Sequence, residues 1–474
     1  MAPRLKAGHM ISKPKNKISK GRAAKRALHC LLPFALGLVC LNSAAQAATQ
    51  ISAEKIAAYQ AMPENERVRL LITLAKTHQS DDAAELIQHF PLQGEHAADR
   101  TLFITGLIKA DHGDLTGAVQ NYRDALADDP GLTLVRAELA KTLVALDEGD
   151  SAKHHLQLLE AEAPNETDAA GIKSFIDQID ANHPLKFNGY ISIAPTTNMN
   201  NGSSHSTVYS PYFHGYGNIP VSQQKTSGVG LSTGVSVGYS KRLGNKLRAV
   251  VAGNVGAQIY KDSNFDSLFF SQSASLQYLL GKGYIAAGAV ASQSIDPIAR
   301  DVSYYSYGPR VSLVQQLTQR NSLNASSTFE WRNYGELNLQ NGTASLNNMS
   351  LSHAIDQSFT FTVMGGYDQI NAASKDVSYN TKYAGLSIYK ELPMGITVNA
   401  DTQARFSNFD EFNIITGVTR QDHRYIGSLE LTKRDLNIMG FAPALSYTYT
   451  RNQSNVANFD YDSHAVDFRL TKNF

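Results

Sequence analysis

The chain has 474 residues, enough for two or three domains, and only 18% of them are charged, below the roughly 25% of soluble proteins. Its formal net charge of +1 conceals an asymmetry, because residues 1–47 contain nine of the 43 lysines and arginines and none of the 42 acidic residues. The rest of the chain is therefore mildly acidic, and this composition gives no support for nucleic-acid binding.

Residues 1–47 have the organisation of a secretory signal peptide. A basic region ends at Arg26, an apolar run extends from Ala27 to Leu41, and small residues then form an A-x-A cleavage pattern that ends at Ala47. The apolar run is shorter than the about 20 residues of a transmembrane helix, so the pattern favours a cleaved signal peptide over a retained anchor.

The two cysteines of the chain, Cys30 and Cys40, both lie inside this predicted signal peptide. Cys40 follows Val39, whereas a lipidation signal places a small residue before the modified cysteine, so we expect no lipid anchor there. The mature protein is therefore predicted to contain neither a disulfide nor a thiolate metal site.

Residues 48–183 are rich in alanine, leucine and charged residues at helical spacing, and they contain an internal repeat. Two copies of a small–small–aromatic–small–proline skeleton are offset by about 34 residues, the period of the tetratricopeptide repeat. The first copy is Gly106, Ala118, Tyr122, Ala125 and Pro130, and the second, with leucines at two places, is Ala140, Ala152, Leu156, Leu159 and Pro164. Small residues let paired helices approach closely, so the pattern predicts an α-solenoid, with a third, degenerate copy over residues 52–96.

A solenoid of this kind has a concave face, which the first helix of each pair lines. Its geometry predicts a partner-binding groove formed by two sets of residues, Arg100, Phe103 and Leu107 in one repeat and Leu134, Ala137 and Lys141 in the next. The alternative is that the repeats only stiffen a linker, in which case these side chains serve packing or solvation.

Residues 184–474 change to glycine, serine, threonine, asparagine and tyrosine, with a period of two that is typical of strands with one apolar and one polar face. Such runs predict about 14 strands of a transmembrane antiparallel β-barrel. Their connections alternate between short turns, as near residues 393–394 and 435, and longer loops, as over residues 196–224. With an even strand count the barrel begins and ends on the periplasmic side, so the helical repeats are expected in the periplasm.

The last eleven residues, 464–474, support the barrel prediction. Val466, Phe468 and Leu470 alternate with polar residues, and Phe474 is the final residue. A terminal strand that closes on an aromatic residue is typical of bacterial outer-membrane barrels, whose outer face meets lipid. We therefore assign these four residues as the signal for the barrel-assembly machinery.

Residue patterns of catalytic or cofactor sites are weak throughout. The clustered glycines from Gly228 to Gly234 lie in a strand pattern and lack the strand–turn–helix context of a phosphate loop. The adjacent His154 and His155 point in different directions on a helix, so they cannot share a metal ion as an i,i+4 pair could. We predict no catalytic residue, cofactor or metal site, and no enzymatic activity.

The start of the strand region resembles a known family. It contains Phe187-Asn188-Gly189-Tyr190, then a P-x-T-N-x-N segment with Pro195, Asn198 and Asn200, and after a long loop an S-G-x-G opening with Gly228 and Gly230. This is similar to the first barrel strands of the surface lipoprotein assembly modulators, called Slam. The order of signal peptide, repeats and barrel matches too, and the short helical region implies a compact form of the family.

The resemblance implies an outer-membrane translocon that delivers client proteins from the periplasm to the cell surface. Its partners would be a client lipoprotein or a secreted haem-binding protein, the barrel-assembly machinery during biogenesis, and outer-membrane lipid. Two alternatives stay open at this point. One is an exopolysaccharide export porin, and the other is a passive porin with an accessory periplasmic domain.

Overall fold

The protein is described by a computed structural model. The structure describes residues 52–471 except for residues 183, 213–216, 297–300, 336–337, 357, 414–415, 435 and 437–440. The predicted signal peptide, 1–47, and Phe474 of the predicted assembly signal lie outside the described residues.

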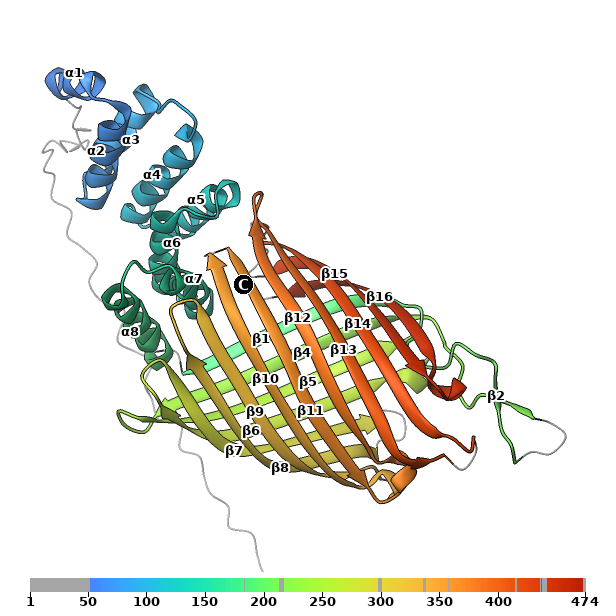
Figure 1. The fold of residues 1–474 in the computed structure, drawn as a ribbon. Helices are drawn as coiled ribbons and strands as arrows, with labels where there is room; N and C mark the ends of the chain where they lie inside the picture. The colour runs from blue at the N-terminus through green and yellow to red at the C-terminus, as the bar shows by residue number, and fades with distance from the viewer. Residues whose placement is uncertain are drawn as a thin grey trace, which may run out of the picture. The chain divides into compact units, whose positions relative to one another are not determined.

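The N-terminal part of the described chain consists of helices that follow one another in antiparallel pairs (Figure 1). Their bounds are α1 Ala53–Ala61, α2 Glu64–Lys76, α3 Ser80–His89, α4 Ala97–Asp111, α5 Leu115–Asp128, α6 Thr133–Ala145, α7 Gly149–Ala161 and α8 Glu166–Asn182. The two clear repeats correspond to the pairs α4–α5 and α6–α7, which confirms the predicted tetratricopeptide solenoid. None of the described helices is both long and apolar enough to cross a membrane.

The first repeat shows why its skeleton has a small residue in the first helix. Gly106 of α4 faces Tyr122 of α5, and a β-carbon at Gly106 would lie 2.4 Å from Cε1 of the Tyr122 ring. Tyr122 is itself buried in the hydrophobic core of the helices and contacts Phe103 with a ring-centroid separation of 6.0 Å. The glycine therefore lets the tyrosine ring fill the space between the two helices.

We expect Gly106→Ala to lower the stability of the helical part by about 1–3 kcal/mol, because the new methyl group overpacks the core against Tyr122. Gly171→Ala is the matched control, since Gly171 lies in α8 and a β-carbon there would meet no atom within 4 Å. Alanine at this position is expected to stabilise by about 0.5–1 kcal/mol. Thermal unfolding followed by circular dichroism checks both signs, and stabilisation by Gly106→Ala would contradict the packing described here.

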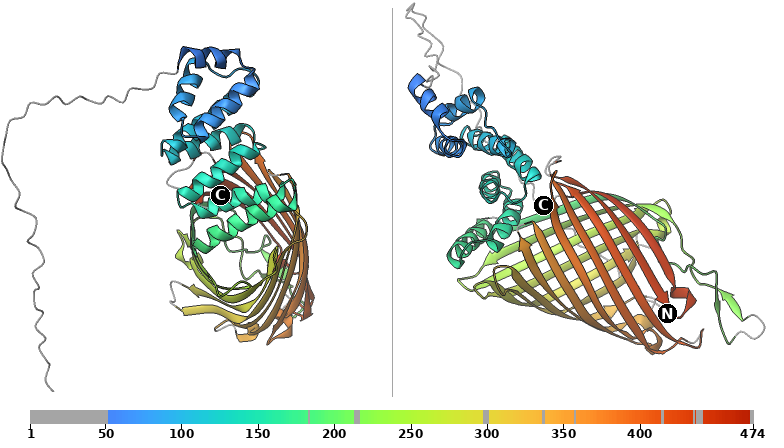
Figure 2. Two further views of the ribbon diagram at one scale, coloured as in Figure 1. Left: turned by 90° about the vertical axis from the view of Figure 1, so that its left-hand side faces the viewer. Right: turned by 45° about the horizontal axis from the view of Figure 1, so that its top comes forward.

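The second part is a closed antiparallel barrel of 14 strands, as predicted (Figures 1 and 2). The strands are β1 Leu185–Thr196, β4 Gly228–Arg242, β5 Leu247–Tyr260, β6 Ser267–Leu279, β7 Gly283–Asp296, β8 Asp301–Gln316, β9 Asn321–Asn333, β10 Gly342–Asp356, β11 Phe359–Ala372, β12 Tyr379–Leu392, β13 Ile396–Phe412, β14 Thr419–Lys433, β15 Ala442–Ser454 and β16 Tyr461–Thr471. β1 pairs with both β4 and β16, with Ile193 opposite Phe468, and this pairing closes the barrel.

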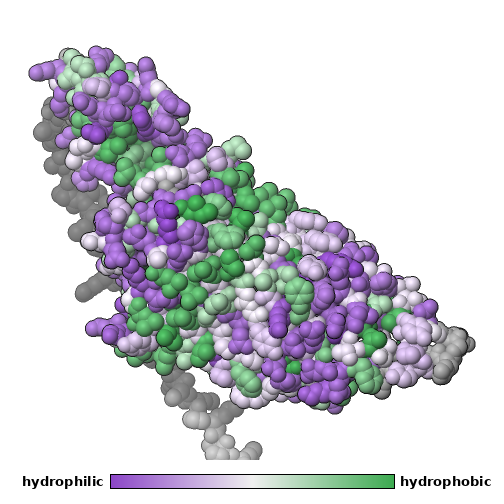
Figure 3. Space-filling view, viewed as in Figure 1, coloured by the Kyte–Doolittle hydropathy of each residue, from purple (hydrophilic) through white to green (hydrophobic). Residues whose placement is uncertain are grey.

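Alternate side chains point to the two faces of the barrel wall. Val466 and Phe468 of β16 are exposed on the outer face, and the other barrel strands also expose apolar residues there. The barrel therefore presents an apolar surface to lipid. Figure 3 shows apolar side chains gathered over the part of the barrel nearer the helices, and a more polar surface toward the opposite end.

The connections divide between the two ends of the barrel. Most turns at the end where the chain enters β1 are short, whereas the first connection at the other end spans residues 197–227 and contains the hairpin of β2 (Thr207–Tyr209) and β3 (Asn218–Pro220). The prediction of a short turn near residue 435 was wrong. That connection spans residues 434–441, and it begins with Arg434, whose guanidinium forms an ion pair with Glu391.

Candidate functional site

The helical part carries a cavity of about 410 Å³ between α2, α4 and α6. Three of the six residues predicted for the partner groove line it, namely Arg100, Phe103 and Leu134. Leu134 of α6 is 65% exposed at this cavity. The cavity therefore offers an apolar surface that is open to solvent.

The other three predicted groove residues are not part of the cavity lining. Leu107 is buried in the core of the helices, and Ala137 packs partly buried against the same core. The exposed Lys141 forms an ion pair with Glu138 at 3.2 Å. These three side chains serve packing or surface charge pairing in the structure.

Sequence reasoning missed several residues that complete the cavity. Val68 and Ile72 come from α2, and Asp99 and Asp129 add carboxylates to the lining. Burial raises the pKa of Asp99, and the nearby Asp128 carboxylate raises it further. The sequence could have indicated these apolar residues of α2 only if the degenerate third repeat had been assigned to a defined pair of helices. The cavity can hold an apolar side chain of a peptide beside mixed charges.

A second site joins the helices to the barrel through a buried ion pair. Arg136 of α6 donates from a terminal guanidinium nitrogen to Oε2 of Glu391 in β12 at 2.9 Å, and both side chains are completely buried. The same guanidinium nitrogen donates to the carbonyl of Pro130 at 2.7 Å. Because a buried charge is costly unless it is paired and hydrogen-bonded, this contact specifies how α6 meets the barrel.

Four further side chains complete what we call the junction cluster, which consists of Arg136, His154, His155, Tyr389, Glu391 and Arg434. The Tyr389 hydroxyl donates to Oε1 of Glu391 at 2.8 Å, and Arg434 pairs with Oε2 at 3.0 Å. His154 of α7 lies 3.3 Å from the same Oε1. In the adjoining turn, the backbone N–H of Met394 donates to the carbonyl of Ala127 in α5.

The adjacent histidines of α7 point to different partners, as their helical spacing implies. His154 contacts Glu391 and Tyr389, whereas Nδ1 of His155 lies 3.3 Å from the Arg136 guanidinium. Burial, with added repulsion from His154 and Arg136, holds the pKa of His155 well below its usual value. His155 is therefore neutral in the folded protein near neutral pH.

The stability of the helical part is expected to fall as the pH drops below about 6.5, the ordinary pKa of histidine. Below that pH an unfolded chain binds a proton at His155 that the folded chain does not bind. The free energy of unfolding therefore falls by up to about 1.4 kcal/mol per pH unit. Thermal unfolding over a pH series checks this, with His155→Gln as the comparison. An equal slope for the wild type and the variant would contradict the assignment.

The predicted motif at the barrel start shapes the first residues of the long connection. Asn198 is buried, and its side chain bonds both the backbone N–H and the carbonyl of Gly202 at 2.9 Å. Asn200 accepts from the N–H of Thr226 at 3.0 Å and donates to the carbonyl of Gln224 at 2.8 Å. Asn198 thus closes the turn at the start of the connection, and Asn200 ties its two arms together.

The remaining motif residues lie in the first two barrel strands. Pro195 of β1 is paired with Val229 of β4. A β-carbon at Gly228 would lie 2.5 Å from the sulfur of Met199, and one at Gly230 would lie 2.7 Å from the Tyr260 ring. These glycines leave room for larger side chains against the inner wall, and the contacts are packing contacts.

The comparisons with known proteins match both parts of the chain. Residues 109–174 match a model of the tetratricopeptide repeat, and residues 185–474 match the model of the surface lipoprotein assembly modifier. The chain belongs to the surface lipoprotein assembly modifier family. Membership in this family and the closed barrel together place the protein in the outer membrane.

Similar proteins extend the likeness across the repeats. The surface lipoprotein assembly modifier of Pasteurella multocida is 21% identical over 413 residues, which cover 81% of this chain and 79% of the relative. Surface lipoprotein assembly modifier 1 of Haemophilus influenzae is 19% identical, covering 76% of this chain and 75% of the relative. The hemophilin secretion modulator of Acinetobacter baumannii is 21% identical, covering 83% and 82%.

Proposed function

We propose that this protein delivers specific client proteins, either surface lipoproteins or secreted haem-binding proteins, from the periplasm to the cell surface. The observation that carries the proposal is the match of the whole barrel to the surface lipoprotein assembly modifier family. The names of the relatives, which refer to lipoprotein assembly and hemophilin secretion, favour protein delivery over polysaccharide export or passive diffusion. The protein acts as an assembly or secretion factor and not as an enzyme.

The proposed arrangement has residues 1–47 as a cleaved signal peptide, residues 48–183 in the periplasm and residues 184–474 in the outer membrane. Its support is topological. Short turns of bacterial barrels face the periplasm, and the turn after β12 contacts α5. The terminal signal of Val466, Phe468, Leu470 and Phe474 would serve the barrel-assembly machinery.

The repeat cavity is the proposed first contact for the client. Arg100, Phe103 and Leu134 would bind an apolar client side chain flanked by charge, and the remaining predicted groove residues would act through packing. The junction cluster fixes α6 and α7 to β12, so a client bound to the repeats is held beside the barrel.

A barrel of this size limits the state of the client. Barrels of about 16–18 strands leave only an aqueous channel, so a lumen of 14 strands does not pass a folded domain. The client is expected to cross unfolded or through an opened seam of the wall. A client locked by an engineered disulfide should reach the surface more slowly than its reduced form, and equal rates would exclude the unfolded route.

The proposed function is tested by labelling surface proteins on intact cells with a non-permeant biotin reagent. Cells that lack the gene should lose one or a few lipoproteins, or a secreted haem-binding protein, from the labelled or released fraction while keeping them in the periplasm. Expression of the full chain should restore them. Identical labelled and released proteins in both strains would reject the proposal.

A further inference from the structure

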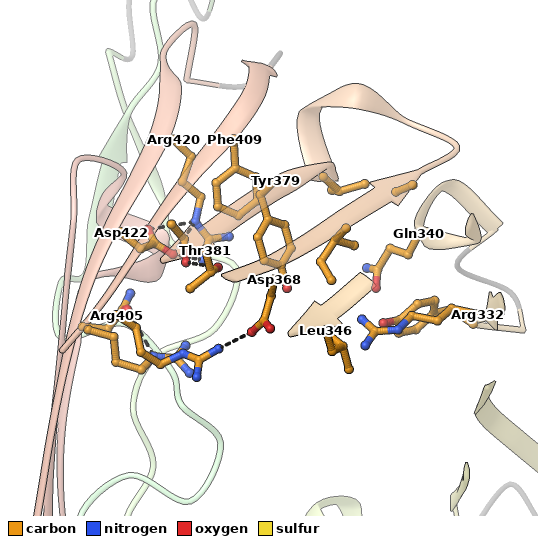
Figure 4. Close-up of a pocket in the computed structure, with 17 residues that line it drawn as sticks. Arg332, Gln340, Leu346, Asp368, Tyr379, Thr381, Arg405, Phe409, Arg420 and Asp422 are labelled. Atoms are coloured by element: carbon orange, nitrogen blue, oxygen red, sulfur yellow. Dashed lines mark hydrogen bonds and ion pairs between the residues drawn. The ribbon is translucent and has the colours of Figure 1, made fainter. Parts of the chain in front are cut away.

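The inner wall of the barrel carries a second cavity, of about 430 Å³, at the end with the longer connections (Figure 4). Its charged lining residues are Arg332, Arg405, Arg420, Arg424, Asp368 and Asp422, which we call the lumen arginine site. They come from strands β9, β11, β13 and β14, and no sequence motif unites them. Four arginines against two aspartates give the cavity wall an excess of positive charge.

Three of the four arginines have carboxylate partners. Arg405 lies 2.9 Å from Asp368, and Arg420 lies 2.5 Å from Asp422, as the dashed lines in Figure 4 mark. Arg332 pairs with Glu330, beside the cavity, at 3.0 Å. These pairs hold their guanidinium groups in fixed positions around the cavity.

Arg424 is the exception, because no carboxylate among the described residues pairs with it. Its side chain donates a hydrogen bond from Nε to Oδ1 of Asn452 at 3.3 Å, and its guanidinium lies 5.9 Å from the Tyr461 ring centroid. The neutral Asn452 orients the arginine without neutralising it. The terminal nitrogens of Arg424 therefore remain available as a positively charged fork.

The sheet register places Arg424 directly opposite Arg405 on the same face of the wall. Like charges in directly opposed positions destabilise a strand pair, so this pairing conflicts with strand stability alone. Asp368 already neutralises the charge of Arg405. The arrangement leaves one charge unbalanced, which an incoming anion between the two arginines would neutralise.

Aromatic rings give the cavity a shape that suits a planar group. Tyr379 and Phe409 line it with their ring centroids 4.8 Å apart, and the Arg420 guanidinium lies 4.5 Å from the Phe409 centroid. The Arg405 guanidinium lies 4.4 Å from the centroid of Tyr383. Stacked guanidinium groups are pre-organised, so they lose little freedom when they bind an anion.

We propose that the lumen arginine site binds a carboxylate group through Arg424, with Arg405 opposite. A guanidinium fork matches the two oxygens of a carboxylate, and a single unbalanced positive charge matches one negative charge. Asp368 and Asp422 disfavour a doubly charged phosphate by repulsion. The carboxylate belongs either to acidic side chains of a polypeptide segment in the lumen or to a free small dicarboxylate, and the volume is in the usual range for a small ligand. The proposal concerns the barrel wall alone, so it can fail while the delivery function stands.

The test measures binding of a short fluorescent peptide of alternating glutamate and glycine to the purified full chain in detergent micelles. We expect saturable binding that the glutamine version of the peptide does not show. Arg424→Gln should weaken binding at least about tenfold, because a charge-assisted bond to the ligand is lost. If that variant does not fold, Arg424→Lys keeps the charge without the fork and should weaken binding several-fold.

The matched control is Arg310→Gln. Arg310 also faces the lumen, since the next residue of β8, Val311, is exposed on the outer face. It donates to Ser326 at 3.4 Å, outside the cavity. Its replacement should leave peptide binding unchanged. Equal losses in Arg310→Gln and Arg424→Gln would overturn the proposal, because they would show attraction to lumen charge in general.

Competitors distinguish the sources of the carboxylate. Free glutarate is added at the same carboxylate concentration as the peptide. If glutarate displaces the peptide, the site is assigned to small dicarboxylates. If only unlabelled glutamate peptide displaces it, the site is assigned to polypeptide segments. Both results support a carboxylate site. Equal binding of the glutamine peptide, unchanged binding by folded Arg424→Gln, or displacement by inorganic phosphate and not by either carboxylate ligand would overturn it.

Discussion

Glu391→Gln is expected to weaken the attachment of the helices to the barrel by about 3–5 kcal/mol, the cost of breaking a buried ion pair from one side. The neutral amide leaves the Arg136 guanidinium buried without a countercharge. Arg434 loses its partner in the same step, and its side chain is only 14% exposed. Removing one carboxylate therefore leaves two largely buried cations together.

The measurement is limited proteolysis of the folded protein in detergent, with denaturant unfolding of the helices followed by circular dichroism. Glu391→Gln should release a helical fragment at protease concentrations that leave the wild type intact. Glu411→Gln is the matched control, because Glu411 is an exposed glutamate near the far end of β13. Equal resistance of the wild type and Glu391→Gln would show that the junction cluster does not hold the two parts together.

Val255→Arg is expected to destabilise the barrel by about 2–4 kcal/mol, the cost of an arginine on the lipid face near the bilayer midplane. Val255 lies midway along β5 and is 44% exposed on the outer face. Its register neighbours, Val235 of β4 and Phe270 of β6, are apolar as well. The new charge would lie in hydrocarbon with no partner on either neighbouring strand.

The adjacent Asn254→Arg separates lipid exposure from a general effect of the substitution. Asn254 points into the lumen, where its side-chain amide donates to Ser271 at 3.1 Å, so an arginine there remains in a wet environment. We expect the barrel midpoint in guanidinium to fall for Val255→Arg and to change little for Asn254→Arg, in phospholipid vesicles. The opposite order would mean that the two faces of the wall are assigned the wrong way round.

The architecture could be predicted from the sequence because it is carried by local periodicity. The spacing of Gly106, Tyr122 and Pro130 specifies one helical pair, and alternation such as that of Val466 and Phe468 specifies one strand. Each of these patterns is set by side chains that lie near one another in the chain. The even strand count and the alternating connections then follow by counting.

The junction cluster and the lumen arginine site could not be predicted in the same way. Arg136 and Glu391 are 255 positions apart, and neither belongs to a motif. Arg405 and Arg424 become neighbours only through the register of β13 with β14. Phe103 and Leu107 share helical spacing and are both buried in the core of the helices, but only Phe103 also lines the cavity. Spacing alone cannot separate the residues that line a cavity from those that pack beside it.

Our central claim is that the client passes along the inner face of the barrel. Site-specific photo-crosslinking in living cells tests this claim most directly. Two adjacent residues of β10 make the comparison, because Asn348 bonds to Ser326 on the lumen face and Met349 is 59% exposed on the lipid face. A photoreactive side chain at position 348 should form adducts with the client that surface labelling identifies, and one at position 349 should form none. Client adducts at position 349 only, or at neither position during active delivery, would contradict passage along the lumen.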